Sequence, residues 1–185
     1  MKLVALILVL ALMLTGCGST EELLDRAMGL RARLLSGSCS FEAEITADYG
    51  DELLSFGVNC EGDSKGNLAF QVTQPETIAG ITGTLDREGG KLTFRDTALA
   101  FPLLADGQLS PAGAPWVLYT TLRGGYLTSV GMEDELLRVT IDDSYAEDAL
   151  TVDVWLDGEN IPVRAEILYD GRRILTLVIR NFQIL

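Results

Sequence analysis

Among the residues of this chain that could react chemically, Cys17 has the most informative sequence around it. An apolar run begins just after Lys2 and closes with the residues Leu14-Thr15-Gly16-Cys17. A basic residue, a short apolar segment and small residues before a cleavage point are typical of a secretion signal. A cysteine at that point is typical of a bacterial lipoprotein. We therefore expect residues 1–16 to be removed as a signal peptide and Cys17 to carry lipid.

Lipid on Cys17 would hold the rest of the chain, residues 17–185, at a membrane surface, because each buried CH₂ contributes about 0.8 kcal/mol. The apolar run is shorter than the roughly 20 residues that cross a bilayer, which disfavours a spanning helix. A buried core helix is the other alternative. We expect one soluble domain in the cell envelope, outside the cytoplasm and tethered through Cys17.

Two further cysteines, Cys39 and Cys60, remain for pairing in an oxidising compartment. A hairpin with Tyr49-Gly50 as its two-residue turn places these cysteines directly opposite each other. They form a non-hydrogen-bonded pair, in which Cα atoms approach to about 4.5 Å. We predict a disulfide that contributes about 3 kcal/mol, with two reduced and buried thiols as the alternative.

The chain contains no histidine, which removes the commonest general base and metal ligand. The acidic pairs Asp142-Asp143 and Glu147-Asp148 occur in stretches typical of solvated turns. An enzyme acting through paired carboxylates is the least favoured function. We predict no catalytic residue, no metal site and no cofactor. The net charge of −13 disfavours nucleic acid, because such binding depends on neutralising phosphates.

The elements that position these residues follow from hydrophobic periodicity. Ser19 and Glu22 form a capping box, and apolar residues at helical spacing predict a helix over residues 20–35. Alternating residues then predict an antiparallel meander. Its strands are expected on both sides of Tyr49-Gly50, around 68–72, 81–85 and 92–94, and near 126–131, 135–142, 149–156, 161–169 and 172–183.

Residues 99–125 interrupt this meander with three prolines. A short helix from Pro115 to Gly124-Gly125 would carry Trp116 and Tyr119, as a lid over the sheet or as a plug in the core. About nine strands in one sheet tend to curl. We therefore predict an α+β fold: a curved antiparallel half-barrel with an N-terminal helix and a lid-like helical insertion.

Two predicted strand registers near the C-terminus determine which side chains lie on each face of the sheet. The turn Asp170-Gly171 would pair Ile167 with Ile174, and pairing Leu156 with Ile161 would place Asp153 opposite Arg164. The last strand also carries apolar residues on both faces, at 174–179. Such a strand needs cover on both faces unless one face lines a groove.

The order of elements resembles the LolA/LolB/LppX-like superfamily of lipoprotein carriers. Residues 85–96 resemble its glycine-turn hairpin, residues 99–125 its helical lid, and residues 161–182 its closing hairpin. The resemblance covers nearly all of residues 17–185. It implies an apolar cavity for acyl chains, or a scaffold that reuses the fold. A lipidated Cys17 favours a tethered receptor, acceptor or scaffold over a soluble shuttle.

The leading hypothesis for function is non-catalytic binding of an apolar ligand, a lipid or acyl chain, in the half-barrel. The alternative is a protein-binding scaffold for an envelope or cell-wall enzyme. The candidate lining residues are aromatic, although each could instead fill the core: Phe41, Phe56, Phe70, Trp116 and Tyr119.

Overall fold

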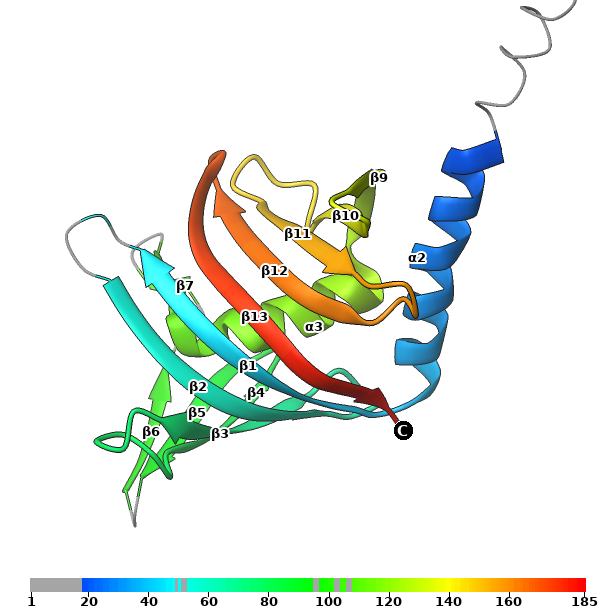
Figure 1. The fold of residues 1–185 in the computed structure, drawn as a ribbon. Helices are drawn as coiled ribbons and strands as arrows, with labels where there is room; N and C mark the ends of the chain where they lie inside the picture. Colours follow the sequence, from blue (N-terminus) through cyan, green and yellow to red (C-terminus); the bar gives the residue numbers. More distant parts are fainter. Residues whose placement is uncertain (1–17, 49, 51–52, 95–96, 102–103, 106–107) are drawn as a thin grey trace, which may run out of the picture.

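A curved antiparallel sheet wrapped around one helix forms the body of the protein (Figure 1). The computed structural model describes residues 18–48, 50, 53–94, 97–101, 104–105 and 108–185. Cys17 and the predicted signal peptide lie outside these residues. The helical elements are α2 (Gly18–Ser36), the 3₁₀ turn η2 (Pro111–Gly113) and α3 (Ala114–Gly124).

The strands follow the chain as two meanders on either side of the insertion. They are β1 (Cys39–Asp48), β2 (Leu53–Gly62), β3 (Leu68–Gln74), β4 (Thr82–Asp86), β5 (Gly89–Phe94), β6 (Thr97–Phe101), β7 (Leu104–Ala105), β8 (Gln108–Leu109), β9 (Tyr126–Glu133), β10 (Leu136–Asp142), β11 (Leu150–Leu156), β12 (Pro162–Tyr169) and β13 (Arg172–Ile184). Eleven of them form one sheet in the order β6-β5-β4-β3-β2-β1-β13-β12-β11-β10-β9, and β7 pairs with β8. The predicted half-barrel is confirmed, with β6 as a strand that the sequence did not predict.

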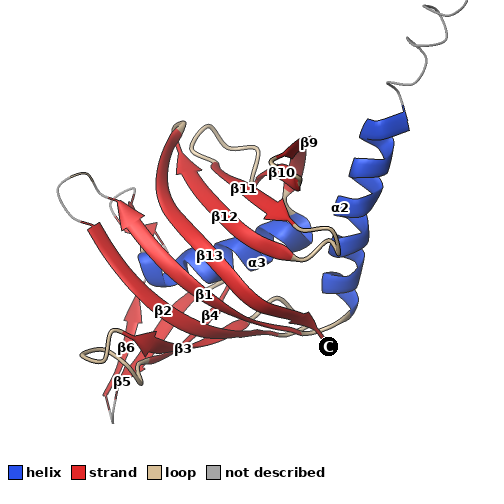
Figure 2. Ribbon diagram, in the orientation of Figure 1, coloured by secondary structure: helices blue, strands red, loops and turns tan. Residues whose placement is uncertain are grey.

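The concave face of the sheet is the core of the protein. On β1 the odd-numbered side chains Phe41, Ala43 and Ile45 are buried there, and intervening Glu42 and Glu44 are exposed. This alternation is the period-two pattern of a sheet with one buried face. Figure 2 shows α3 lying across the concave side, whereas α2 stands beside the sheet.

Helix α3 is a plug in the core rather than a lid over it. Its side chains Leu118 and Tyr119 are 0% and 1% exposed. Helix α2 packs on α3 and β9 through its predicted apolar stripe, which includes Leu30 and Leu34. The described helix already includes Gly18, so Ser19 lies inside α2 and the predicted N-cap at Ser19 is wrong. Neither helix has the length and apolar character needed to cross a bilayer, within the described residues.

The register of the β1–β2 hairpin differs from the prediction by two residues. Cys39 lies opposite Gly62, and Cys60 lies opposite Phe41. The predicted disulfide is not formed: both cysteines are free and buried. A slip of two residues keeps every side chain on its own face, so the apolar pattern did not distinguish the two registers. Gly62 also leaves room for a ring, because a Cβ there would lie 2.7 Å from the side chain of Tyr119.

Irregularities also shift the registers near the C-terminus. The Asp170-Gly171 turn is confirmed, but a bulge pairs Ile167 with Leu175 rather than Ile174. This shift directs Leu175, Leu177 and Ile179 into the core, where all three are buried. A strand that is apolar at both even and odd positions fits either register, so its sequence does not reveal a bulge.

Asp153 on β11 lies opposite Glu166 rather than opposite the predicted Arg164. It is buried on the convex face at 3% exposure. Its carboxylate accepts hydrogen bonds from Arg138 Nη2 at 2.7 Å and from Thr140 Oγ1 at 2.6 Å. The carboxylate of Asp153 is therefore compensated by one cation and one hydroxyl of β10.

Trp155 lies on the same convex face as Asp153, next to two arginines. The guanidinium groups of Arg138 and Arg164 lie 5.3 and 4.4 Å from the centre of its ring. Arg164 and Arg173 both donate to Glu166. Cations over an aromatic face are attracted by its quadrupole. The ring is consequently buried on the convex face of the sheet, which neither α2 nor α3 covers.

Replacement of the cation beside Asp153 should destabilise the fold. In Arg138→Met the buried carboxylate loses its charged partner, and we expect the free energy of unfolding to fall by about 1–3 kcal/mol. Arg180→Met is the matched control, because its pair with Glu44 is 3.6 Å long and exposed; such pairs contribute about 0–1 kcal/mol. Urea unfolding measures both. Equal effects of the two variants would contradict the described environment of Asp153.

The two buried thiols should resist alkylation in the folded protein. Burial raises the pKa of Cys39 to about 11 and also raises that of Cys60, and the thiolate is the reactive form. In a Cys17→Ser chain at pH 7, maleimide should label neither thiol before denaturation and both afterwards, without reductant. Mass spectrometry counts the labels. Labelling that requires a reductant would show that the two cysteines are joined.

Candidate functional site

Toward the β1–β2 hairpin, the side chains on the concave face of β2 become increasingly exposed to solvent. On β2 the side chains that face the core are Cys60 and Val58, at 1% and 2% exposure, then part-buried Phe56 and finally Leu54, which is 46% exposed. Leu54 lies opposite Ala47 of β1, whose side chain is fully buried. Leu54 therefore still points to the concave side, and it is exposed because no other side chain of the core covers it there.

Strands β5 and β6, near the other end of the sheet, also carry exposed apolar side chains on the concave face. Leu92 lies opposite Gly83 on β4, which lies opposite the buried Phe70 on β3. Leu92 therefore faces the concave side. Leu99 of β6 is the partner of Leu92 and shares that face, yet it is 64% exposed.

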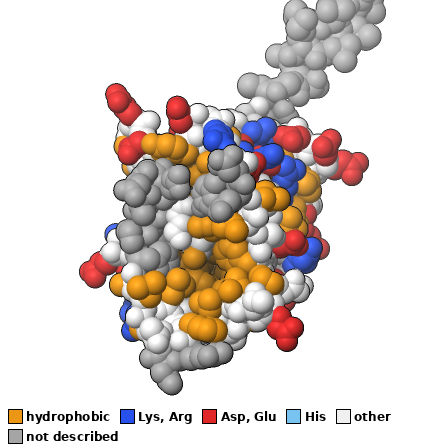
Figure 3. Space-filling model, turned by 90° about the vertical axis from the view of Figure 1, so that its left-hand side faces the viewer, with side chains coloured by type: hydrophobic (Ala, Val, Ile, Leu, Met, Phe, Trp, Pro, Cys, Tyr) orange, Lys and Arg blue, Asp and Glu red, His pale blue; other side chains and the backbone are white. Residues whose placement is uncertain are grey.

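We call this region the apolar mouth, defined by Leu54, Phe56, Leu92, Phe94 and Leu99. The ends of β2, β5 and β6 that carry it lie on the left side of Figure 1. Figure 3 shows that side of the molecule, where hydrophobic side chains surround a hollow. Exposed apolar patches of this kind mark sites that bind other apolar surfaces.

The side chains of the mouth can bury an apolar ligand, but they carry no group that could catalyse a reaction. None of its five side chains is ionisable, and none can act as an acid, a base or a nucleophile. Each Å² of apolar surface removed from water there contributes about 25 cal/mol. The arrangement suits a ligand that is held by its hydrocarbon portion.

The predicted aromatic lining residues lie in different places. Phe56 belongs to the mouth. Phe41 is buried and stacks on Phe182 with ring centroids 5.4 Å apart. Phe70 is buried against Gly83, where a Cβ would clash with its ring.

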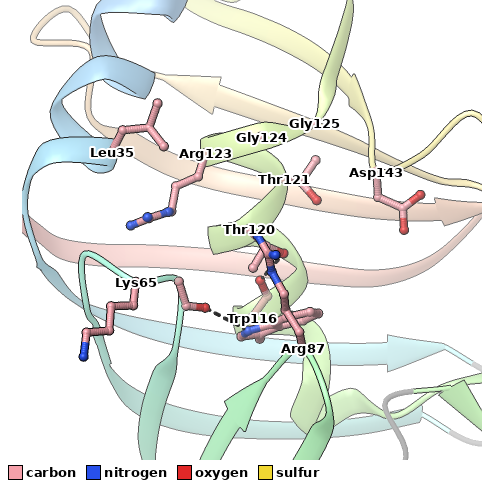
Figure 4. A pocket seen from close by; sticks show the side chains of 11 residues that line it. Leu35, Lys65, Arg87, Trp116, Thr120, Thr121, Arg123, Gly124, Gly125 and Asp143 are labelled. Carbon is pink, nitrogen blue, oxygen red and sulfur yellow. Dashed lines mark hydrogen bonds between the residues drawn. The ribbon is translucent and has the colours of Figure 1, made fainter.

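The two aromatic residues of α3 lie away from the mouth. The Tyr119 hydroxyl donates to the backbone oxygen of Asp63 at 2.5 Å and accepts from Arg123 Nη1 at 2.6 Å. Burial raises the pKa of Tyr119. Trp116 is half-buried in a separate pocket on α3 (Figure 4). Phe56 is thus the only one of the five predicted lining residues on the exposed part of the concave face, and the other four residues of the mouth were not selected by the sequence analysis.

The turn between β2 and β3 holds α3 in place through Asp63. Burial alone would raise the pKa of Asp63, but hydrogen bonds from Asn67, Lys65 and Gly66 outweigh it and lower the pKa. The carboxylate Oδ1 accepts from the backbone N–H groups of Lys65 and Asn67 at 2.8 and 2.9 Å. The stability that this lowered pKa provides is therefore present above the usual aspartate range and is lost as the pH falls through the folded value.

No protein-family model and no curated protein matches this sequence. Among solved structures, the fold is similar to a putative outer membrane lipoprotein-sorting protein domain from Vibrio parahaemolyticus, with 9% identity, coverage of 87% of this chain and 91% of that one, and a TM-score of 0.48. It is also similar to a LolA superfamily protein from Nitrosomonas europaea, with 10% identity, coverage of 86% and 93%, and a TM-score of 0.44.

A third similar structure is the lipoprotein LppX from Mycobacterium tuberculosis, with 15% identity, coverage of 88% and 95%, and a TM-score of 0.41. These three likenesses concern the fold alone. At this level of likeness, what the site can bind follows from its own residues.

Proposed function

We propose that this protein is a membrane-tethered lipoprotein of the cell envelope that binds a lipid or acyl chain at the apolar mouth, without catalysis. The observation that carries the proposal is the exposure of Leu54 and Leu99 on the concave face, at 46% and 64%. A folded chain gains from covering such surface, and a hydrocarbon chain supplies cover without requiring polar partners.

A lipid on Cys17 would offset the repulsion between this acidic protein and anionic headgroups. The protein has a net charge of −13, which opposes direct contact with anionic headgroups. Lipid on Cys17 would supply the attraction that the surface lacks. Helix α2 begins at the next residue, and its N-terminal part extends away from the body (Figure 1). Because α2 packs on α3 and β9 through Leu30 and Leu34, only its N-terminal part would separate the body of the protein from the bilayer.

Charged substitutions in the mouth should weaken ligand binding. In Leu54→Asp and Leu99→Asp the carboxylate would have to lose water when the ligand binds. We expect each to weaken binding of cis-parinaric acid, a fluorescent fatty acid, by about tenfold or more. Fluorescence titration measures the affinity.

Val178→Asp is the matched control for these substitutions. Val178 is 40% exposed, like Leu54, but it lies on the convex face opposite Glu44. We expect its affinity for the probe to equal that of the unaltered protein. Equal weakening by all three substitutions, or by none of them, would refute binding at the mouth.

Removal of the lipidation site should release the protein from the membrane. In cells that express Cys17→Ala, we expect loss of metabolic labelling by a fatty acid and a shift from the membrane fraction to the soluble or unprocessed fraction. Cys60→Ala keeps Cys17 and serves as the control for the loss of a thiol. Unchanged membrane retention and lipid labelling of Cys17→Ala would end the tether proposal.

A protein-binding scaffold is the second candidate function. Its supporting observation is β9, an edge strand of the sheet that exposes Tyr126 and Met132 at 39% and 54%. Edge strands with exposed apolar side chains are surfaces on which other proteins pair. Co-purification of one envelope protein in fixed proportion, lost in Met132→Asp and kept in Leu99→Asp, would favour the scaffold over the lipid binder.

A further inference from the structure

A pocket of about 370 Å³ lies on the side of α3, distinct from the apolar mouth. Figure 4 shows that its walls come from separate parts of the chain. Trp116, Thr120 and Arg123 belong to α3, whereas Lys65 comes from the β2–β3 turn and Arg87 from the β4–β5 turn. Leu35 of α2 and Asp143 after β10 complete the walls.

Three cationic residues line this pocket in an acidic protein. Lys65, Arg87 and Arg123 line it together with a single carboxylate, that of Asp143. None of the three cations forms an ion pair within the described part of the chain, although arginines on the convex face do. The chain as a whole carries 14 basic and 27 acidic residues, so a gathering of unpaired cations is opposite to its overall charge.

Arg123 is held rigidly by neutral groups. Its Nη1 donates to the backbone oxygen of Leu34 at 2.8 Å, and its Nη2 donates to that of Ser64 at 2.6 Å. Its guanidinium carbon also lies 5.0 Å from the centre of the Tyr119 ring. These partners fix the position of the charge without neutralising it. Arg123 thus supplies a preorganised positive field.

The other two cations extend from short and well-fixed turns. Asp63 Oδ1 accepts from the backbone N–H of Lys65 at 2.8 Å. Asp86 Oδ1 accepts from the backbone N–H of Glu88, next to Arg87, at 2.8 Å. The backbone of each turn is ordered, and both cationic side chains are exposed. They are therefore able to donate to a ligand.

The remaining wall adds a flat apolar surface and an unused hydroxyl. Trp116 Nε1 donates to the backbone oxygen of Gly66 at 3.2 Å, which fixes the indole ring. Thr121 is 3% exposed, and its hydroxyl has no hydrogen-bond partner among the described residues. Buried polar groups without partners are rare in folded proteins.

We propose that this pocket binds the phosphate group of a small phosphate ester, with the organic part of the ester against Trp116. Guanidinium and ammonium groups form strong charge-assisted hydrogen bonds to phosphate oxygens. Arg87 and Lys65 supply such donors, and Arg123 supplies the fixed field. This site is independent of the apolar mouth and of the tether on Cys17.

The two tryptophans of the chain allow a direct test by NMR. Trp116 lines the pocket, whereas Trp155 lies on the convex face. We expect inorganic phosphate and glycerol 3-phosphate to shift the indole N–H resonance of Trp116 in a saturable manner and to leave that of Trp155 unchanged. Phosphatidylcholine vesicles with and without phosphatidic acid test the same group on a lipid.

Arg87→Gln should weaken phosphate binding about tenfold, because a hydrogen bond to a charged group is lost. Lys91→Gln removes the same charge from an exposed residue of β5 outside this pocket and should leave the affinity unchanged. A response to soluble phosphates assigns a soluble ester, and a response only to phosphatidic acid assigns a lipid headgroup. No shift of Trp116 with any probe, or equal affinities of the two variants, would overturn the proposal.

Discussion

The burial of one face of a long antiparallel sheet, which only the short helix α3 crosses while α2 packs beside it, is the constraint on which the structure depends. Alternation along every strand collects apolar side chains on the concave face. Helix α3 has only 11 residues, about 16 Å of length, and its side chains Leu118, Tyr119 and Leu122 are buried in the core. Where its cover ends, the same alternation continues into solvent at Leu54 and Leu99. The apolar mouth is thus a direct consequence of the mismatch between sheet and helix.

Helix α3 links the two proposed sites through its opposite sides. One side packs against the sheet and leaves the mouth uncovered at the hairpin end. The other side carries Trp116 and Arg123 into the basic pocket. Tyr119 and Arg123 bind the backbone of the β2–β3 turn, so the helix is fixed to the strands by polar contacts as well as by burial.

Much of the fold could be predicted from the sequence because local signals agree with the global arrangement. Helical spacing of apolar residues, turn residues and alternation with period two predicted the order of helices and strands and the Asp170-Gly171 hairpin. The errors of strand register share one physical cause. A slip of two residues in β1–β2 and a bulge after Ile167 both preserve an acceptable apolar pattern, so the predicted opposition of Cys39 and Cys60 was wrong. The site was harder to predict. Leu54 and Val58 both occupy concave positions in the alternation of β2, and the sequence does not reveal that Val58 is covered and Leu54 is exposed.

The central claim is that hydrocarbon binds at the mouth rather than within the plugged core. Its most direct test is the measurement of intermolecular nuclear Overhauser effects between a bound fatty acid and the methyl groups of a selectively labelled protein. Contacts from the acyl chain to the methyl groups of Leu54, Leu92 and Leu99, with none to buried Leu137, are the predicted result. Contacts confined to other surfaces, or the absence of contacts to these three leucines, would contradict the account.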